Sequence, residues 1–252
     1  MRSWIYNLDI GSIRSCADEW KMFPIKRCFA KNIEVTYLHA SALKPGFKPH
    51  EPHIHSDEEL IIIVSGKAQI ITKQENGDLK YSEKLSRGAV VYHESGKPHT
   101  ITPGGDEPAV YICLRWNSPG REKKENKDVL RNSIYLPDFS ASEQVFKIDI
   151  LFESHTEFLE KLHCHTSVMQ PGAGYDSHRD DHDVIIFVLE GQVQTLNQTA
   201  GPDNIIFYRA EEEHGMRNIG SQPAKYIVFE FHNREKMSKK QLLWKLFKKF
   251  WE

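Results

Sequence analysis

The chain's most distinctive residues are three histidines and one glutamate at short, regular spacings. His53 and His55 are separated by one residue, Glu59 follows four residues later, and His99 comes forty residues further on. Imidazoles and a carboxylate together suit a divalent transition metal ion. Four protein ligands leave up to two positions of an octahedral ion open for substrate, water or dioxygen. The sequence therefore predicts a metal centre in the first half of the chain.

A strand would bring three of these ligands to one side. Side chains alternate between the two faces of a strand, so positions 53, 55 and 59 share a face. Residues 60–64 follow directly, and they are apolar, rich in β-branched side chains and closed by a glycine. Such a short run is typical of a buried strand. His99 then has to arrive from a neighbouring strand.

The sequence repeats itself at an offset of about 125 residues. His53 corresponds to His178 at an offset of 125, and His99 corresponds to His214 at an offset of 115. A second apolar run, residues 184–189, lies after the repeated histidine as the first run does. Order and spacing are both kept, which indicates two homologous modules. Many short strands with turn signals between them favour a sandwich or a barrel.

These patterns resemble the cupin superfamily, and the two copies make the chain similar to a bicupin. The resemblance rests on two motifs, namely His53, His55 and Glu59 with Gly66, and Gly88 and Gly96 with His99. Glu94 stands where the family usually has a proline, which leaves the ligands intact. The resemblance covers residues 35–116 and 160–231. It implies an all-β fold of two tandem double-stranded β-helix barrels, which are jelly-roll-like, with the metal inside.

Three segments are expected on this basis. Residues 1–118 would form the N-terminal barrel with the metal site, residues 119–235 the second barrel, and residues 236–252 a basic amphipathic helix. Residues 238–251 carry leucine, phenylalanine and tryptophan on one face and lysine on the other. Such a helix could make peripheral membrane contact or dock on a barrel or a partner subunit. Residues 154–162 could form a short helix or a loop.

The second module departs from the motif. His178 and His214 keep the first and last histidine positions, but Asp180 and Val184 replace the second histidine and the glutamate. His182 has the same strand parity as His178. A second metal could therefore be held by His178, Asp180, His182 and His214. The alternative is a degenerate module that only supports folding or dimerisation.

Three further residues are candidates for acting on a substrate. By the cupin pattern, one face of the strand after His99 looks inward and carries Tyr111, Cys113 and Arg115. Arg115 could bind a carboxylate or phosphate through two parallel hydrogen bonds, or it could form a salt bridge at the rim. His50 lies just before the ligand strand and could act as an acid or base at the mouth. Cys113 is expected to be a small buried residue rather than a nucleophile.

The composition excludes several classes of function. The 252 residues include 33 Lys and Arg and 35 Asp and Glu, so the net charge of −2 does not favour nucleic acid. Four cysteines without a CxxC spacing argue against a disulfide framework or a zinc ribbon and fit a reducing compartment. No signal peptide is visible, and no apolar run approaches the ~20 residues of a membrane span. A cytoplasmic protein is expected.

The leading expectation is a metal-dependent enzyme that acts on a small oxygenated substrate in the N-terminal barrel. Among Fe2+, Mn2+, Ni2+ and Zn2+, we favour Fe2+ and a dioxygenase, because three histidines and one carboxylate with open positions suit ferrous iron. One alternative is a Lewis-acid isomerase or decarboxylase of a sugar or keto acid. Another is a non-catalytic protein that binds or senses a small molecule. The resemblance also makes a homodimer plausible.

Overall fold

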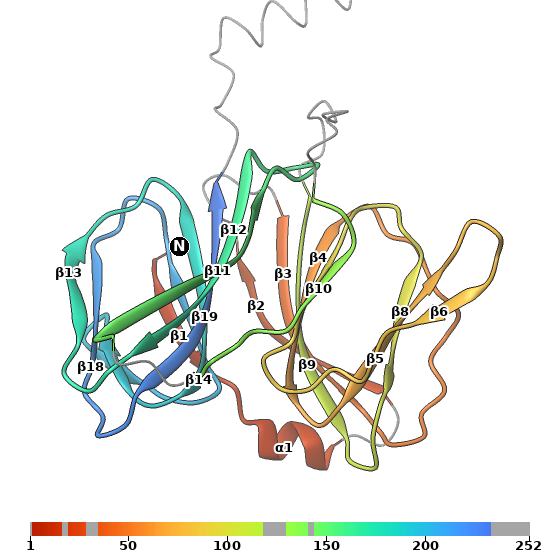
Figure 1. The fold of residues 1–252 in the computed structure, drawn as a ribbon, viewed down its shortest axis with the longest axis horizontal. Helices are drawn as coiled ribbons and strands as arrows, with labels where there is room; N and C mark the ends of the chain where they lie inside the picture. Colours follow the sequence, from red (N-terminus) through yellow and green to blue (C-terminus); the bar gives the residue numbers. More distant parts are fainter. Residues whose placement is uncertain (1, 17–19, 29–34, 118–129, 141–143, 233–252) are drawn as a thin grey trace, which may run out of the picture.

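The protein is analysed as a computed structural model that describes residues 2–16, 20–28, 35–117, 130–140 and 144–232. More than half of the described residues lie in β-strands, which form two barrels side by side (Figure 1). The strands of the first barrel are β2 (Trp20–Cys28), β3 (Val35–Leu43), β4 (Glu58–Ser65), β5 (Ala68–Lys73), β6 (Leu79–Tyr81), β7 (Val90–His93), β8 (His99–Pro103), β9 (Ala109–Asn117) and β10 (Ser133–Tyr135). They form a six-stranded sheet of order β10-β7-β4-β9-β3-β2 and a smaller sheet of order β6-β5-β8.

The second barrel repeats this plan. Its strands are β1 (Trp4–Asn7), β11 (Phe146–Ser154), β12 (Lys161–Met169), β13 (Gly174–His178), β14 (Asp183–Glu190), β15 (Val193–Thr195), β16 (Gln198–Ala200), β17 (Asn204–Tyr208), β18 (His214–Asn218) and β19 (Ala224–His232). The larger sheet has the order β1-β17-β14-β19-β12-β11, and the smaller has the order β13-β18-β15-β16. The expected all-β fold of two cupin-like barrels is therefore confirmed.

The two larger sheets pack against each other and bury both faces of their central strands. On β4, Leu60 and Ile62 belong to the core between the barrels, where they join Ile185 and Phe187 of β14. The alternate residue Ile61 belongs to the core inside the first barrel. A strand buried on both faces needs apolar side chains at every position, since neither face meets water. This explains why the apolar runs of β4 and β14 do not alternate with polar residues.

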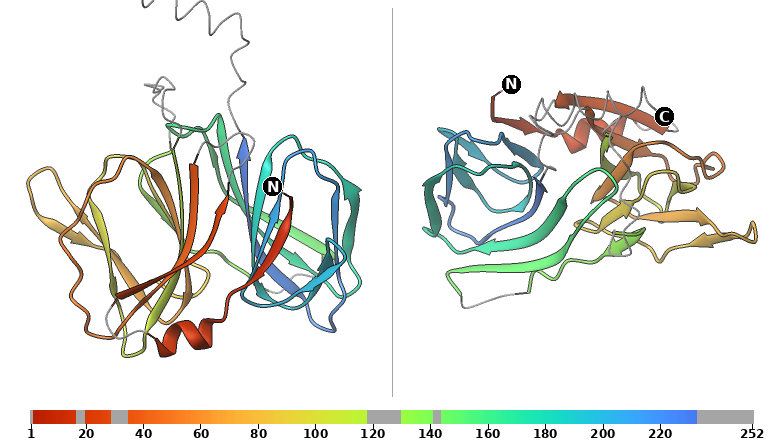
Figure 2. Two further views of the ribbon diagram at one scale, coloured as in Figure 1. Left: turned by 180° about the vertical axis from the view of Figure 1, so that it is seen from behind. Right: turned by 90° about the horizontal axis from the view of Figure 1, so that it is seen from above.

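The two barrels exchange strands near the ends of the predicted modules. Trp4 of β1 pairs with Phe207 of β17, in the sheet of the second barrel. Ser133 of β10 pairs with Tyr92 of β7, in the sheet of the first barrel. Seen from behind, β1 lies along the edge of the second barrel (Figure 2). The boundary predicted near residue 118 therefore does not separate the two sheets cleanly.

The segments outside the strands differ in part from what the sequence predicted. A helix that we did not predict, α1 (Ile10–Ser15), follows β1, and the Asp9 carboxylate caps it by accepting a hydrogen bond from the Ser12 N–H at 3.0 Å. Residues 155–160, left open between helix and loop, connect β11 to β12 without a helix. The predicted C-terminal helix of residues 236–252 lies outside the described residues. No helix within the described ranges is long and apolar enough to cross a membrane.

Substituting alanine for Gly66 is expected to destabilise the first barrel strongly. Gly66 has a φ of +68°, and an added Cβ would lie 2.3 Å from the carbonyl oxygen of Pro108. Gly77 is a matched control, because its φ is +91° and nothing lies within 4 Å of an added Cβ. We expect Gly77→Ala to cost about 1–2 kcal/mol of unfolding free energy from backbone strain, and Gly66→Ala to cost about 3 kcal/mol or more. If urea unfolding shows that both variants lose the same unfolding free energy, the steric explanation is contradicted.

Candidate metal centre

The four predicted ligands of the first barrel form one cluster. The Nε2 atoms of His55 and His99 are 3.2 Å apart. Glu59 Oε2 lies 2.8 Å from His99 Nε2 and 3.7 Å from His55 Nε2. His53 is joined to His99 by an isolated β-bridge and offers a ring nitrogen within 4.8 Å of those of His55 and His99. The structure thus brings together the donor set that the spacing predicted.

The geometry of the donors fits a transition metal ion. His55 Nδ1 lies 2.9 Å from the Asp57 carbonyl oxygen, and His99 Nδ1 lies 2.9 Å from that of Lys97. A ring nitrogen beside a carbonyl must donate, so each Nε2 keeps its lone pair for the cluster. Around an ion with bonds of about 2.1 Å, neighbouring ligand atoms lie about 3.0 Å apart in an octahedron and about 3.4 Å apart in a tetrahedron. The separations among His55, Glu59 and His99, from 2.8 to 3.7 Å, span these values.

Glu59 is held in its charged form, as a metal ligand must be. Burial alone would raise the pKa of Glu59, but the adjacent imidazoles of His55 and His99 outweigh burial and hold that pKa well below its usual value. The Cys113 thiol donates a hydrogen bond to Glu59 Oε1 at 2.8 Å. Burial, followed by the charge of Glu59, keeps the pKa of this thiol well above its usual value. Cys113 is therefore a protonated donor that orients the carboxylate.

One residue of the cluster escaped the sequence analysis. His93, on β7, stacks on His99 with ring centroids 3.9 Å apart and the ring planes 5° from parallel. Burial, with a smaller effect of His99, lowers the pKa of His93 to about 3, so its ring is neutral. His93 is two residues from Val91, which packs inside the barrel, so the alternation along β7 already indicated an inward side chain. It occupies one of the unspecified positions between Gly88 and Gly96 of the second motif, and for that reason it was missed.

A small cavity opens directly onto the cluster of predicted ligands, His53, His55, Glu59 and His99. It has a volume of about 250 Å³, room for about eight water molecules. Its wall includes His53, Glu59 and His99 from the cluster. The three proposed substrate-contacting residues, His50, Tyr111 and Arg115, line the same cavity. The structure therefore places all three beside the predicted ligands.

Each of these three residues has a distinct environment. Arg115 Nη2 forms a salt bridge of 2.9 Å with Asp57 Oδ2, while its Nε is buried without a hydrogen-bond partner among the described residues. Tyr111 is buried, and its hydroxyl accepts a hydrogen bond of 3.3 Å from Trp20 Nε1. The exposed His50 ring makes an edge contact with the His53 ring at a centroid distance of 4.6 Å.

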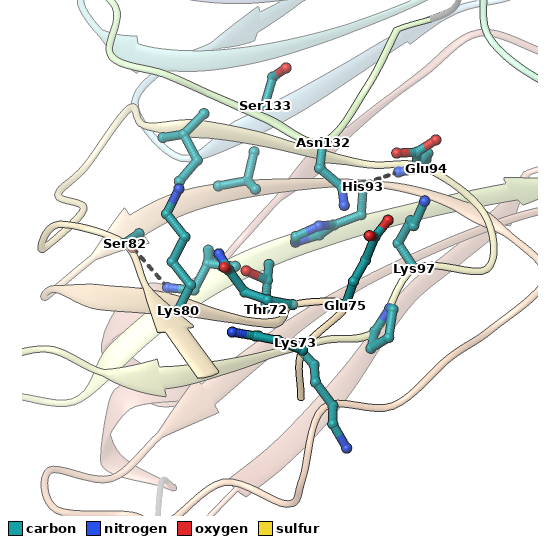
Figure 3. A pocket seen from close by; sticks show the side chains of 16 residues that line it. Thr72, Lys73, Glu75, Lys80, Ser82, His93, Glu94, Lys97, Asn132 and Ser133 are labelled. Carbon is teal, nitrogen blue, oxygen red and sulfur yellow. Dashed lines mark hydrogen bonds between the residues drawn. The ribbon is translucent and has the colours of Figure 1, made fainter. Parts of the chain in front are cut away.

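A larger cavity of about 800 Å³ lies on the side of the first barrel (Figure 3). It is lined by polar side chains that include Lys73, Lys80 and Lys97. His93 also lines it and stacks on His99, so this ring lies between the larger cavity and the metal cluster. None of the four predicted ligands lines the larger cavity. The chemistry indicated by the sequence therefore belongs to the smaller one.

In the second barrel, three of the four proposed ligands come together. Asp180 Oδ2 lies 3.2 Å from His214 Nε2 and 3.7 Å from His178 Nε2. His182 does not join them, and its ring stacks on that of His232 with centroids 3.8 Å apart. The parity argument for His182 was wrong because residues 179–182 form an irregular connection between β13 and β14.

Comparison with protein families identifies the class of this fold. The chain matches the cupin domain (Cupin_2) over residues 41–115 and 165–230, which together are more than half of its length. The chain therefore belongs to the cupin family, with two copies of the domain. The comparison with curated proteins found no match.

Solved structures share the two-barrel fold at low sequence identity. A cupin 2 conserved barrel domain protein from Leptotrichia buccalis has 12% identity and a TM-score of 0.62, with 92% of this chain and 97% of that chain covered. A salicylate 1,2-dioxygenase from Pseudaminobacter salicylatoxidans has 11% identity and a TM-score of 0.66, with 91% and 83% covered. The oxalate decarboxylase of Lactobacillus farciminis, in its formate complex, has 14% identity and a TM-score of 0.56, with 96% and 90% covered. At these identities the likeness concerns the fold alone.

Proposed function

We propose that the N-terminal barrel is the centre of a metal-dependent enzyme of the dioxygenase type. The observation that carries this proposal is the convergence of His53, His55, Glu59 and His99 beside a cavity whose wall includes three of them. The Nδ1 atoms of His55 and His99 donate to carbonyl oxygens, which leaves both Nε2 atoms free to bind the ion. These four residues would hold Fe2+. When bound, ferrous iron would supply redox chemistry toward dioxygen. A salicylate dioxygenase among the solved structures with this fold is consistent with that choice.

The residues of the cavity favour a small anionic substrate. The Arg115 guanidinium offers five N–H donors, and its salt bridge to Asp57 leaves the buried Nε without a partner among the described residues. A substrate carboxylate or hydroxyl oxygen would satisfy that donor. Burial raises the pKa of Tyr111 far above neutrality, so this hydroxyl acts as a hydrogen-bond donor rather than a base. Both groups would orient a substrate without accepting its proton.

A second candidate function is that of a decarboxylase or isomerase of a keto acid or sugar. The exposed position of His50 favours it, because this imidazole contacts His53 at the mouth and can exchange protons with water. Such a reaction needs a group that delivers a proton to substrate carbon or oxygen. An oxalate decarboxylase also shares the fold.

Metal-dependent oxygen uptake tests the two proposals against each other. Metal-free protein would be loaded separately with Fe2+, Mn2+, Ni2+ or Zn2+ and mixed with small hydroxy, keto and aromatic carboxylates. We expect oxygen uptake only with the Fe2+ form, and loss of at least about 100-fold in Glu59→Gln, because a neutral amide replaces the anionic ligand. Turnover without oxygen uptake would favour the decarboxylase or isomerase. Tight binding of these acids without any turnover would support a non-catalytic binder and overturn both enzyme proposals.

A further inference from the structure

A separate group of histidines and carboxylates lies across the larger sheet of the second barrel. His163 of β12 pairs directly with Glu153 of β11 on one side and with Glu230 of β19 on the other. His165 lies two residues along β12 and therefore shares the face of His163. This face is the inside of the barrel, since Val228, two residues before Glu230, belongs to its interior core. Neighbouring strands thus bring these four side chains together, with Glu153 exposed at the edge of the sheet and the other three further inside.

The atoms of this group are arranged as metal ligands are. His163 Nδ1 lies 2.8 Å from Glu153 Oε2, so Nδ1 donates and Nε2 keeps its lone pair. That Nε2 is 3.0 Å from His165 Nδ1, and Glu230 Oε1 is 4.0 Å from the same His165 nitrogen. The three donors offer one atom each within 4.8 Å of one another. Two ring nitrogens about 3.0 Å apart match adjacent ligands of an ion with bonds of about 2.1 Å.

The local charge also favours a cation. Glu153 and Glu230 bring two carboxylates to a set of imidazoles that is neutral whenever its nitrogens serve as ligands. His163 is buried, and the side chains of His165 and Glu230 are only 12% and 23% exposed, so water screens the charge of Glu230 weakly, although it screens the half-exposed Glu153 more. The other oxygen of Glu230 is already engaged, lying 3.0 Å from His232 Nε2 and 3.5 Å from His182 Nε2. These contacts fix the carboxylate and leave Oε1 facing the group.

The repeat shows that this arrangement is peculiar to the second barrel. At the same offsets as the repeated motif residues, His163 corresponds to Tyr37 and Glu230 to Arg115. The first barrel therefore places a guanidinium where the second has a carboxylate, and a fixed positive charge would repel a metal ion. The group also excludes His178, Asp180 and His214, which form their own cluster.

We propose that His163, His165 and Glu230 form a zinc site, with Glu153 as the residue that positions His163. Two imidazoles and one carboxylate are a ligand set that Zn2+ accepts, with the fourth position open to water. A carboxylate that accepts from the outer nitrogen of a ligating histidine fixes its ring and raises its basicity. The site is independent of the centre in the first barrel and could bind zinc whatever reaction that centre performs.

The test needs the other clusters to be disabled. The full chain carrying His99→Ala, Asp181→Ala and His214→Ala, which breaks the four other potential ligand groups of the described residues, would be stripped with a chelator and titrated with Zn2+ by calorimetry. We expect about one zinc ion per chain. Adding His163→Ala should weaken zinc binding by more than about 100-fold. Adding Glu153→Gln should weaken it by about 10-fold, because a ligating histidine then loses the carboxylate that accepts from its other ring nitrogen. His155→Ala is the matched control, since His155 belongs to none of the ligand groups, and it should leave binding unchanged.

Two further measurements keep the proposal falsifiable. Circular dichroism shows whether each variant is folded, and Glu153→Gln changes an exposed side chain, so it decides the matter if His163→Ala misfolds. Native mass spectrometry of the chain with all other ligand groups intact should count one zinc ion fewer in His163→Ala than in the unchanged protein. The proposal is overturned if the folded background variant binds no zinc, or if its zinc binding is the same with and without His163.

Discussion

Replacement of His55 by alanine is expected to remove one metal ion per chain, the ion of the first barrel. His55 Nε2 lies 3.2 Å from His99 Nε2 and 3.7 Å from Glu59 Oε2, so its loss opens one side of the site. It also removes one of the two imidazoles that hold the pKa of Glu59 low. Loss of a group that only hydrogen-bonds to a metal ligand costs about 10–100-fold in metal affinity. Loss of the ligand His55 itself should therefore lower the affinity by more than about 100-fold.

Metal content by plasma mass spectrometry, followed by titration of the stripped protein, would measure the effect of His55→Ala. His155→Ala should retain the full metal content, because His155 lies outside every ligand group. His214→Ala should retain the ion of the first barrel, since His214 belongs to the second barrel. Thermal unfolding of the metal-free proteins would show whether His55→Ala disturbs the fold. Full occupancy of the first site in a folded His55→Ala protein would refute the ligand assignment.

The second large effect is expected at Glu58, which is buried between the barrels and faces away from its neighbour Glu59. Glu58 Oε1 accepts hydrogen bonds from the Tyr92 hydroxyl at 3.0 Å and the Glu157 N–H at 2.6 Å. Glu58 Oε2 accepts a hydrogen bond from the Thr156 hydroxyl at 2.7 Å. A residue of β4 in the first barrel is therefore tied to the loop that leads into β12 of the second. Burial raises the pKa of Glu58 from 4.5 to about 7, although these hydrogen bonds oppose the increase.

The raised pKa makes stability depend on pH in a defined direction. The folded protein holds the Glu58 proton more tightly than the unfolded chain, so this contribution to stability is complete below pH 4.5 and is lost as pH rises through about 7. From pH 5 to pH 8, the free energy of unfolding should fall by about 2–3 kcal/mol relative to Glu58→Gln. Urea unfolding of both proteins isolates the effect, because their other groups titrate alike. If the difference in unfolding free energy between the unchanged protein and Glu58→Gln does not change with pH, the raised pKa of Glu58 is contradicted.

The spacing of the ligands predicted the metal cluster, but one step of the reasoning was incomplete. We placed His53, His55 and Glu59 on one strand, whereas β4 begins only at Glu58 and His53 reaches the cluster through its bridge to His99. The same use of strand parity was wrong for His182. Alternation applies only where the backbone is extended, and neither connection before β4 or β14 is a regular strand.

Other features depend on contacts that no local pattern contains. Glu58 and Glu59 are adjacent and identical in type, and only the fold shows that one faces the metal cluster and the other meets Thr156, 98 residues away. The zinc group proposed for the second barrel likewise joins Glu153, His163 and Glu230 from three strands. The sequence contained the repeat, and the strands followed from the apolar runs, since both are local signals. Pairings between distant strands had to come from the structure.

The exchange of β1 into the second barrel has a consequence for the nascent chain. The Trp4 ring stacks on the ring of Phe207, which the ribosome adds about 200 residues after Trp4. At about 5–20 residues per second, this interval lasts about 10–40 s. The first barrel can form its own interior during that time, while β1 has no partner. Although β1 precedes the other described strands in the chain, it is therefore among the last of them to reach its native position, and the edge of β17 stays open until it does.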